Sequence, residues 1–114
     1  MQIIFLIASI LFTFQIRAED FINEIVIFKL KNPSKGIEFA HAIVKDIKSF
    51  NDGIVEDKLY QSVNDPTVIA QCITWKSIEK AKEASSSFDT FPSAADFTNQ
   101  SGEVIFFEQF KQIK

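Results

Sequence analysis

The sequence predicts an α+β fold in which strands and helices follow one another in the order βαββαβ. Three observations support this prediction. Residues 24–31 alternate between two faces, residues 35–50 repeat apolar side chains at three- and four-residue spacing, and residues 67–75 form an apolar strand that runs directly into a second helical stripe. A chain with this order of elements forms one antiparallel sheet with two helices on one face, which is the ferredoxin-like plait.

The first strand is "EIVIFKLK" (24–31), in which Val26, Phe28 and Leu30 share one face. "NPS" (32–34) breaks the strand, and Ser34 is expected to cap the following helix. The helix is predicted from Lys35 to Phe50, and "NDG" (51–53) ends it. Its apolar stripe consists of Ile37, Ala40, Ile43, Val44, Ile47 and Phe50.

The second and third strands are predicted at 54–63 and 67–75, joined by the turn "NDP" (64–66). In the third strand, alternation separates two faces: Ile69, Gln71, Ile73 and Trp75 on one, and Val68, Ala70, Cys72 and Thr74 on the other. The unique cysteine and the unique tryptophan are therefore not expected to form one site.

The second helix is predicted to begin at Ile78, capped by Ser77. "DTFPSAADF" (89–97) is expected to be irregular, or a short helical turn begun by Pro92. The final strand, "EVIFFEQFKQI" (103–113), follows Gly102.

The N-terminus is typical of an export signal. An apolar run extends from Ile3 to Phe14, which is shorter than the ~20 residues of a membrane span, and Ala18 offers a small residue for cleavage. We expect residues 1–18 to be a signal peptide and residues 19–114 to form one domain, exported to the periplasm or secreted. After cleavage the chain is not expected to associate with a membrane.

Composition excludes several classes of function. Without residues 1–18 the chain carries eleven lysines, no arginine and fifteen acidic residues, a formal charge of −4. Nucleic-acid recognition depends on basic patches and arginine forks, so no such partner is expected. Because Cys72 and His41 are each unique, a transition-metal site of the usual type is not expected.

The predicted sheet also carries apolar side chains on the face away from the helices. A monomer would leave this face in water, and large exposed apolar patches usually mark an interface. We therefore expect a homodimer that packs sheet on sheet.

The pattern formed by several of these residues resembles that of the dimeric α/β-barrel superfamily. Within this superfamily it is most similar to the antibiotic-biosynthesis-monooxygenase-like (ABM) branch. The resemblance rests on Tyr60 at the end of the second strand, Asp65-Pro66 in the hairpin, and Trp75-x-Ser77-x-Glu79-x-Ala81 at the strand-to-helix junction. It covers roughly residues 23–110. It implies a dimeric α/β barrel, and either a cofactor-independent monooxygenase of quinol-like aromatics or a haem-degrading enzyme.

Two departures argue against haem degradation. Members of that kind resemble this chain but carry a histidine in the second helix region and an asparagine in the first strand. Residues 78–98 contain no histidine, and Asn23 lies just before the predicted strand. No cofactor is therefore expected.

Four residues are candidates for the site. Trp75 lines the ligand cavity in similar proteins and can stack on a flat ligand. Phe88 can form part of the apolar wall of such a cavity. Tyr60 can donate a hydrogen bond to a quinone oxygen. His41 is the candidate acid or base at neutral pH. Each has a structural alternative: core packing for Trp75 and Phe88, and surface cover for Tyr60 and His41.

Two functions remain open at this point. One is a cofactor-independent monooxygenase acting on a small aromatic or quinone-like molecule. The other is a non-catalytic exported dimer that binds an apolar small molecule or a protein partner.

Overall fold

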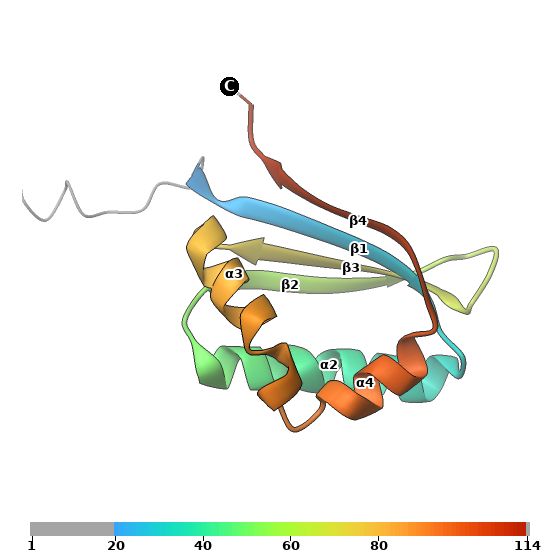
Figure 1. The fold of residues 1–114 in the computed structure, drawn as a ribbon. Coiled ribbons are helices and arrows are strands. Elements are labelled where there is room, and N and C mark those ends of the chain that lie inside the picture. Colours follow the sequence, from blue (N-terminus) through green and yellow to red (C-terminus); the bar gives the residue numbers. More distant parts are fainter. Residues whose placement is uncertain (1–19, 114) are drawn as a thin grey trace, which may run out of the picture.

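The computed structural model describes residues 20–113 and contains one four-stranded antiparallel sheet with helices on one face (Figure 1). The elements are β1 (Ile22–Lys29), α2 (Pro33–Phe50), β2 (Ile54–Gln61), β3 (Val68–Trp75), α3 (Ile78–Ser86), the 3₁₀ turn η2 (Phe88–Thr90), α4 (Ala94–Ser101) and β4 (Glu103–Lys111). None of the helices in the described part of the chain is long and apolar enough to cross a membrane.

The strands lie in the order β2-β3-β1-β4, and every neighbouring pair is antiparallel. The first and third strands are therefore central, while the second and fourth form the two edges. This arrangement is the ferredoxin-like plait, and it confirms the predicted α+β class. The predicted signal peptide, residues 1–18, lies outside the described residues.

Several strand and helix limits differ from the predictions. β1 begins at Ile22, so Asn23 lies within the strand, and its side-chain oxygen accepts a hydrogen bond from Thr74 at 2.9 Å. β2 ends at Gln61, two residues before the predicted end. The cap of α2 is Asn32, whose Oδ1 accepts from the backbone N–H of Lys35 at 3.2 Å, so the prediction of Ser34 as cap was wrong.

Helix α4 is a second difference from the prediction, because residues 94–101 form two turns of helix rather than an irregular segment or a turn begun by Pro92. Asp46 on α2 holds its start, accepting from the backbone N–H of Ser93 at 2.9 Å. Its end requires Gly102, whose φ of 62° is in the left-handed region and whose missing Cβ would meet the carbonyl oxygen of Lys29. Long-range contacts therefore stabilise this helix more than its own sequence does.

The register separates the sheet into two faces. Glu24 pairs with both Ile73 and Gln109, and these three side chains point toward the helices because Ile73 is buried in the core. The helix-facing core is closed by apolar residues of α2, α3 and the segment after it. Its larger buried cluster consists of Ile43, Val44, Ile47, Ile73, Trp75, Ala81, Ala84, Phe91 and Ala94. A second buried cluster consists of Phe28, Leu30 and Ile69.

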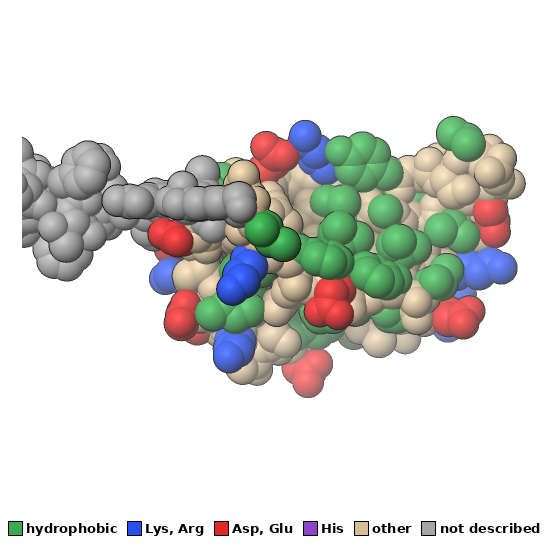
Figure 2. All heavy atoms as spheres, turned by 90° about the horizontal axis from the view of Figure 1, so that it is seen from above, with side chains coloured by type: hydrophobic (Ala, Val, Ile, Leu, Met, Phe, Trp, Pro, Cys, Tyr) green, Lys and Arg blue, Asp and Glu red, His purple; other side chains and the backbone are tan. Residues whose placement is uncertain are grey.

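The opposite side of the sheet, here called the outer face, is apolar as well. Its central members are Ile25, Ile27, Ala70, Cys72, Phe106 and Phe110. Phe106 and Phe110 are exposed on the edge strand, and their rings stack with centroids 6.4 Å apart. Figure 2 looks onto this face and shows hydrophobic side chains gathered across it, with charged groups toward its margins.

Candidate functional site

A cavity of about 410 Å³ lies between the helix-facing side of the sheet and helix α3. This volume is within the range of small-molecule sites in proteins. Its walls come from β1, β3 and β4 on one side and from α2, α3 and the segment 88–97 on the other. Most of the lining is apolar and includes Val26, Ile43, Ile73, Phe88, Phe97 and Phe107.

Four of the polar side chains that line this cavity come from the sheet and are here called the polar end. They are Glu24 on β1, Gln71 and Trp75 on β3, and Gln109 on β4. Glu24 and Gln109 are directly paired across the two strands, and Gln109 Nε2 donates to Glu24 Oε1 at 2.9 Å. An apolar chamber with a few convergent polar groups is the usual form of a site that orients a small ligand.

Glu24 is an unusual residue in this position because its carboxyl lies among apolar side chains. Burial raises its pKa above the ordinary value of 4.5, while the hydrogen bond from Gln109 and the nearby indole of Trp75 lower the pKa in part. The net effect is a carboxyl group that holds its proton more tightly than one in water. Such a group can act as an acid or a base closer to neutral pH.

Trp75 presents a buried and unsatisfied donor. Its side chain is 2% exposed, and the indole Nε1 makes no hydrogen bond of regular geometry with any of residues 20–113, although it lies near the Glu24 carboxyl. A buried donor without a partner costs free energy, on the order of 1–3 kcal/mol, unless a bound group satisfies it. A ligand acceptor at the polar end would satisfy this N–H.

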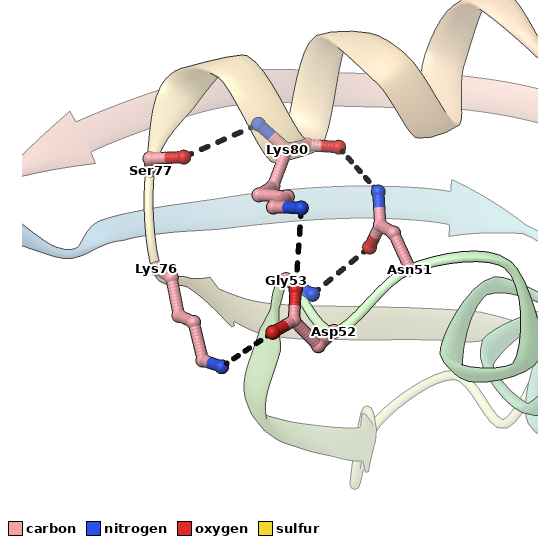
Figure 3. A network of polar contacts seen from close by, with 6 residues as sticks. All are labelled: Asn51, Asp52, Gly53, Lys76, Ser77 and Lys80. Atoms are coloured by element: carbon pink, nitrogen blue, oxygen red, sulfur yellow. Dashed lines mark hydrogen bonds and ion pairs between the residues drawn. The ribbon is translucent and has the colours of Figure 1, made fainter.

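Polar contacts join the α2–β2 turn to the β3–α3 junction (Figure 3), and they lie beside Trp75 in the sequence and in the fold. Asn51 bridges the two segments: its Nδ2 donates to the carbonyl of Lys80 at 3.2 Å, and its Oδ1 accepts from the backbone N–H of Gly53 at 2.9 Å. The backbone N–H of Lys76 donates to the carbonyl of Gly53 at 2.8 Å. Asp52 pairs with the ammonium groups of Lys76 and Lys80, each at 3.2 Å.

The same junction explains two motifs of the sequence. Ser77 caps α3, as predicted, by accepting from the backbone N–H of Lys80 at 3.3 Å. Gly53 passes so close to α3 that a Cβ there would lie 2.5 Å from Lys80 Cβ and 3.1 Å from Trp75 Cε3. The "NDG" and "WKS" segments therefore act together to fix the tryptophan against the cavity.

The structure brings together only two of the four predicted site residues. Trp75 and Phe88 both line the cavity, and their binding roles stay predictions. Tyr60 pairs with Ala70 and so lies on the outer face, 53% exposed and on the opposite side of the sheet from Trp75. His41 is exposed on α2 and is not among the residues that line the cavity.

The sequence interpretation did not identify Glu24, Gln71 and Gln109 as site residues. The signal was present for two of them. Gln71 is in phase with the apolar side chains of β3 and is only 5% exposed, and Glu24 is in phase with Val26 and Phe28. A polar residue on a core-facing phase must find a partner or a ligand, and this reasoning would have identified both.

Cys72 is half-buried on the outer face and carries no disulfide among the described residues. Within residues 20–113, no three His, Cys, Asp or Glu side chains lie close enough together to hold a metal ion. On its sheet side the cavity therefore presents Glu24 and Trp75, together with amide groups, as its reactive or binding chemistry.

Comparison with known proteins identifies the fold. No family model matches the sequence, and no curated protein matches it. Among solved structures, the chain is similar to SnoaB from Streptomyces nogalater, a cofactor-independent oxygenase, with a TM-score of 0.72 at 12% identity, over 83% of this chain and 95% of that one. The likeness is one of structure rather than of sequence.

Two further structures have the same fold. One is a protein from Caulobacter crescentus described as a putative antibiotic biosynthesis monooxygenase, with a TM-score of 0.63 at 17% identity, over 83% of this chain and 92% of that one. The other is a protein from Chloroflexus aurantiacus with the same description, with a TM-score of 0.59 at 19% identity, over 82% and 94% of the two chains. The chain therefore has an ABM-like fold, as its sequence motifs had indicated.

Proposed function

We propose that this chain is a cofactor-independent monooxygenase that oxidises a small aromatic or quinone-like molecule in the cavity between the sheet and α3. The observation that carries the proposal is the combination of an apolar chamber of about 410 Å³ with a half-buried carboxyl and an indole N–H that has no partner of regular geometry in the described chain. The fold shared with a cofactor-independent oxygenase supports the same reaction class.

The proposed chemistry needs little from the protein. In R₂CH₂ + O₂ → R₂C=O + H₂O, the substrate supplies the electrons after a proton is removed from it. One oxygen atom enters the new carbonyl group and the other leaves as water. The protein has to remove the proton, stabilise the resulting anion and exclude solvent, and a carboxyl and two donors in an apolar chamber match these tasks.

Oxygen uptake and ligand binding test the proposal together. The purified protein is titrated with quinols and polyphenols while Trp75 fluorescence reports binding, and dissolved oxygen is followed at saturation. We expect quenching by flat aromatic ligands and oxygen consumption with at least one of them. Binding throughout the series without oxygen consumption would exclude the monooxygenase reaction for these substrates.

That outcome would favour the second candidate, a non-catalytic dimer that binds an apolar small molecule or a protein partner. The observation on its side is the position of His41, because this sole histidine of the sequence lies exposed and outside the cavity. Glu24 is then the one carboxyl among the described lining residues. Absence of both binding and turnover would point to the protein partner.

We also propose that the protein acts as a homodimer packed through the outer face. The dimer proposal is supported by the exposed apolar side chains of β4, which adjoin apolar side chains of β1 and β3 on the same face (Figure 2). A two-fold axis would place the same patch of each copy against the other. Light scattering at micromolar concentration tests this, and a monomer would contradict it.

Export is a further part of the proposal and rests on the N-terminal sequence. Cleavage after Ala18 would leave Glu19 as the first residue of a periplasmic or secreted protein. Mass spectrometry of the protein from its native cells should find Glu19 at the N-terminus. Recovery of a chain that begins at Met1 would contradict cleavage.

A further inference from the structure

We infer that Glu24 is the group that accepts the acidic proton of the ligand, and that the cavity takes an aromatic molecule whose hydroxyl stands beside a carbonyl. In this arrangement the hydroxyl points at the Glu24 carboxylate and a neighbouring oxygen accepts from the indole N–H of Trp75. The inference rests on the proposed function, since it names the ligand class and the proton acceptor of the same cavity.

The position of Glu24 leaves one carboxyl oxygen for a ligand. Oε1 is engaged by Gln109 Nε2 at 2.9 Å, whereas Oε2 makes no hydrogen bond of regular geometry within residues 20–113. Gln109 comes from the adjacent strand at the same register position and so fixes the carboxyl against rotation. Glu24 lines the cavity, so its remaining oxygen can accept a hydrogen bond from a hydroxyl group of the ligand.

Trp75 sets the complementary requirement. Its indole N–H is buried, has no regular partner in the described chain and cannot move away, because the Asn51–Gly53 turn packs on the same residue. An N–H can only donate, so a ligand acceptor at this point would give it a partner that no described residue supplies at regular geometry. Gln71, whose side chain also lines the cavity, makes no side-chain hydrogen bond among residues 20–113 and adds a second donor from the same strand.

The ligand must therefore present a donor and an acceptor close together at one end of an apolar body. A phenol beside a quinone carbonyl has this pattern, and its flat rings suit walls formed by Phe88, Phe97 and Phe107. A simple hydrocarbon would bring neither a donor for the second Glu24 oxygen nor an acceptor for the Trp75 N–H. The cavity thus selects for polarity at one end rather than for apolar volume alone.

The proton transfer is balanced within the site. The O–H bond of the ligand breaks, an O–H bond forms on the Glu24 carboxylate, and the electron pair stays on the ligand oxygen as a phenolate. Trp75 Nε1–H and the Gln71 amide then stabilise that anion.

Among the described residues that line the cavity, Glu24 and Lys82 are the charged groups, and Lys82 is exposed on α3. Burial raises the pKa of Glu24, which makes its carboxylate a stronger base toward a weak acid.

A coloured ligand tests the inference directly. Alizarin, a dihydroxyanthraquinone, changes colour when its hydroxyl ionises, and its dimethyl ether has the same rings without an ionisable proton. Both are titrated into wild type, Glu24→Gln and the control Glu38→Gln, which removes an exposed carboxylate on α2 that neither lines the cavity nor lies on the outer face. The apparent pKa of bound alizarin is read from its visible spectrum.

We expect alizarin to bind to wild type as its anion at a pH where the free dye is neutral, and the control variant to behave in the same way. In Glu24→Gln the apparent pKa of the bound dye should rise by about one unit or more, a tenfold change in the ionisation equilibrium, because an amide donates a weaker hydrogen bond to the phenolate than the protonated carboxyl does. The dimethyl ether should bind to wild type at least tenfold more weakly than alizarin and should show no such difference between the two proteins.

The failures of the two proposals are distinguishable. If neither dye binds to wild type, the ligand cavity of the proposed function is itself contradicted. If both bind equally well and alizarin stays neutral in the wild-type complex, the cavity stands and the role of Glu24 is overturned. The wild-type spectrum alone decides this second point, so the test holds even where Glu24→Gln does not fold.

Discussion

Glu24 on β1 stands directly opposite Gln109 on β4, and the Gln109 side chain donates to its carboxyl at 2.9 Å on the helix-facing side of the sheet. This pair places an ionisable group in the apolar layer between sheet and helices. Most such positions in the sheet carry apolar side chains, which pack without needing a partner. The pair therefore connects the stability of the fold to the chemistry of the cavity.

The stability of the protein should depend on the ionisation of Glu24. Because burial raises its pKa above 4.5, the folded chain holds this proton more tightly than the unfolded chain. The free energy of unfolding should therefore fall as pH rises from about 4.5 to the raised pKa. At pH values above the raised pKa, Glu24 should cause no further fall. Urea titrations across this range measure the effect.

The matched comparison for this prediction is Glu24→Gln, which keeps the shape and cannot ionise. Its pH profile should lack the fall that wild type shows, while all other titrating groups cancel in the difference. Glu38→Gln, at an exposed position on α2, should follow wild type. Parallel profiles for wild type and Glu24→Gln would show that the carboxyl has an ordinary pKa.

Filling the cavity should abolish ligand binding while leaving the fold intact. Ala84 is buried on α3 and lines the cavity, so Ala84→Phe would place a ring in the open space. Binding of a flat aromatic ligand should weaken by tenfold or more, and the loss of stability should be no more than about 1–3 kcal/mol because space is available. Isothermal calorimetry and thermal unfolding measure the two effects.

The control for this change is Ser86→Phe on the same helix, where the side chain is exposed and does not line the cavity. It introduces the same ring without occupying the site, so binding should be unchanged. Equal affinity in Ala84→Phe and Ser86→Phe would place the ligand elsewhere on the molecule.

The outer face should determine the oligomeric state. Phe106→Glu introduces a charge into the stacked pair of Phe106 and Phe110, and in a two-fold dimer it does so twice. Loss of a central aromatic contact costs roughly 2 kcal/mol or more, so the dissociation constant should rise by about 30-fold or more. Sedimentation over a concentration series gives this constant.

Val63→Glu is the matched variant, since it also replaces an apolar residue by glutamate but at a position 97% exposed in the β2–β3 turn. Its dissociation constant should equal that of wild type. A dimer that survives Phe106→Glu unchanged would mean that the copies associate through another surface.

The junction that holds Trp75 should be sensitive at Gly53. Gly53→Ala would bring a Cβ within 2.5 Å of Lys80 Cβ and 3.1 Å of Trp75 Cε3, and Lys80 Cβ cannot withdraw without moving α3. We expect a loss of about 1–3 kcal/mol in the free energy of unfolding and a shift in Trp75 emission. Asp52→Asn removes only exposed ion pairs beside it and should have a much smaller effect. Similar losses for the two variants would show that charge, not close packing, holds the junction.

Much of the fold follows from local patterns. The alternation in β1 and β3 identified the strands and their buried faces, because a strand that is half covered must keep its apolar residues in phase. The segment 94–101 was not identified as a helix because its apolar stripe is short. Contacts with distant residues, such as the bond from Ser93 to Asp46, stabilise it instead.

The site was harder to predict than the fold. Trp75 was identified because a large aromatic at a strand end is visible in the sequence, and Phe88 because it clusters with other rings. Tyr60 was assigned to the same ligand, yet the pairing of β2 and its irregularity near Ile54 place it on the opposite face. A cavity depends on the distance between α3 and the sheet, which no local pattern specifies.

Strand β4 has a consequence for the protein before it assembles. It is a sheet edge that carries apolar groups on both faces, since Phe106 and Phe107 are each exposed. An edge of this kind is a template for the addition of further strands and so for aggregation. Within this strand, Glu103, Glu108 and Lys111 are the charges that oppose such stacking. The newly made monomer is thus the species most prone to aggregation. Its solubility during synthesis depends on how quickly a second copy covers the apolar residues of this edge strand.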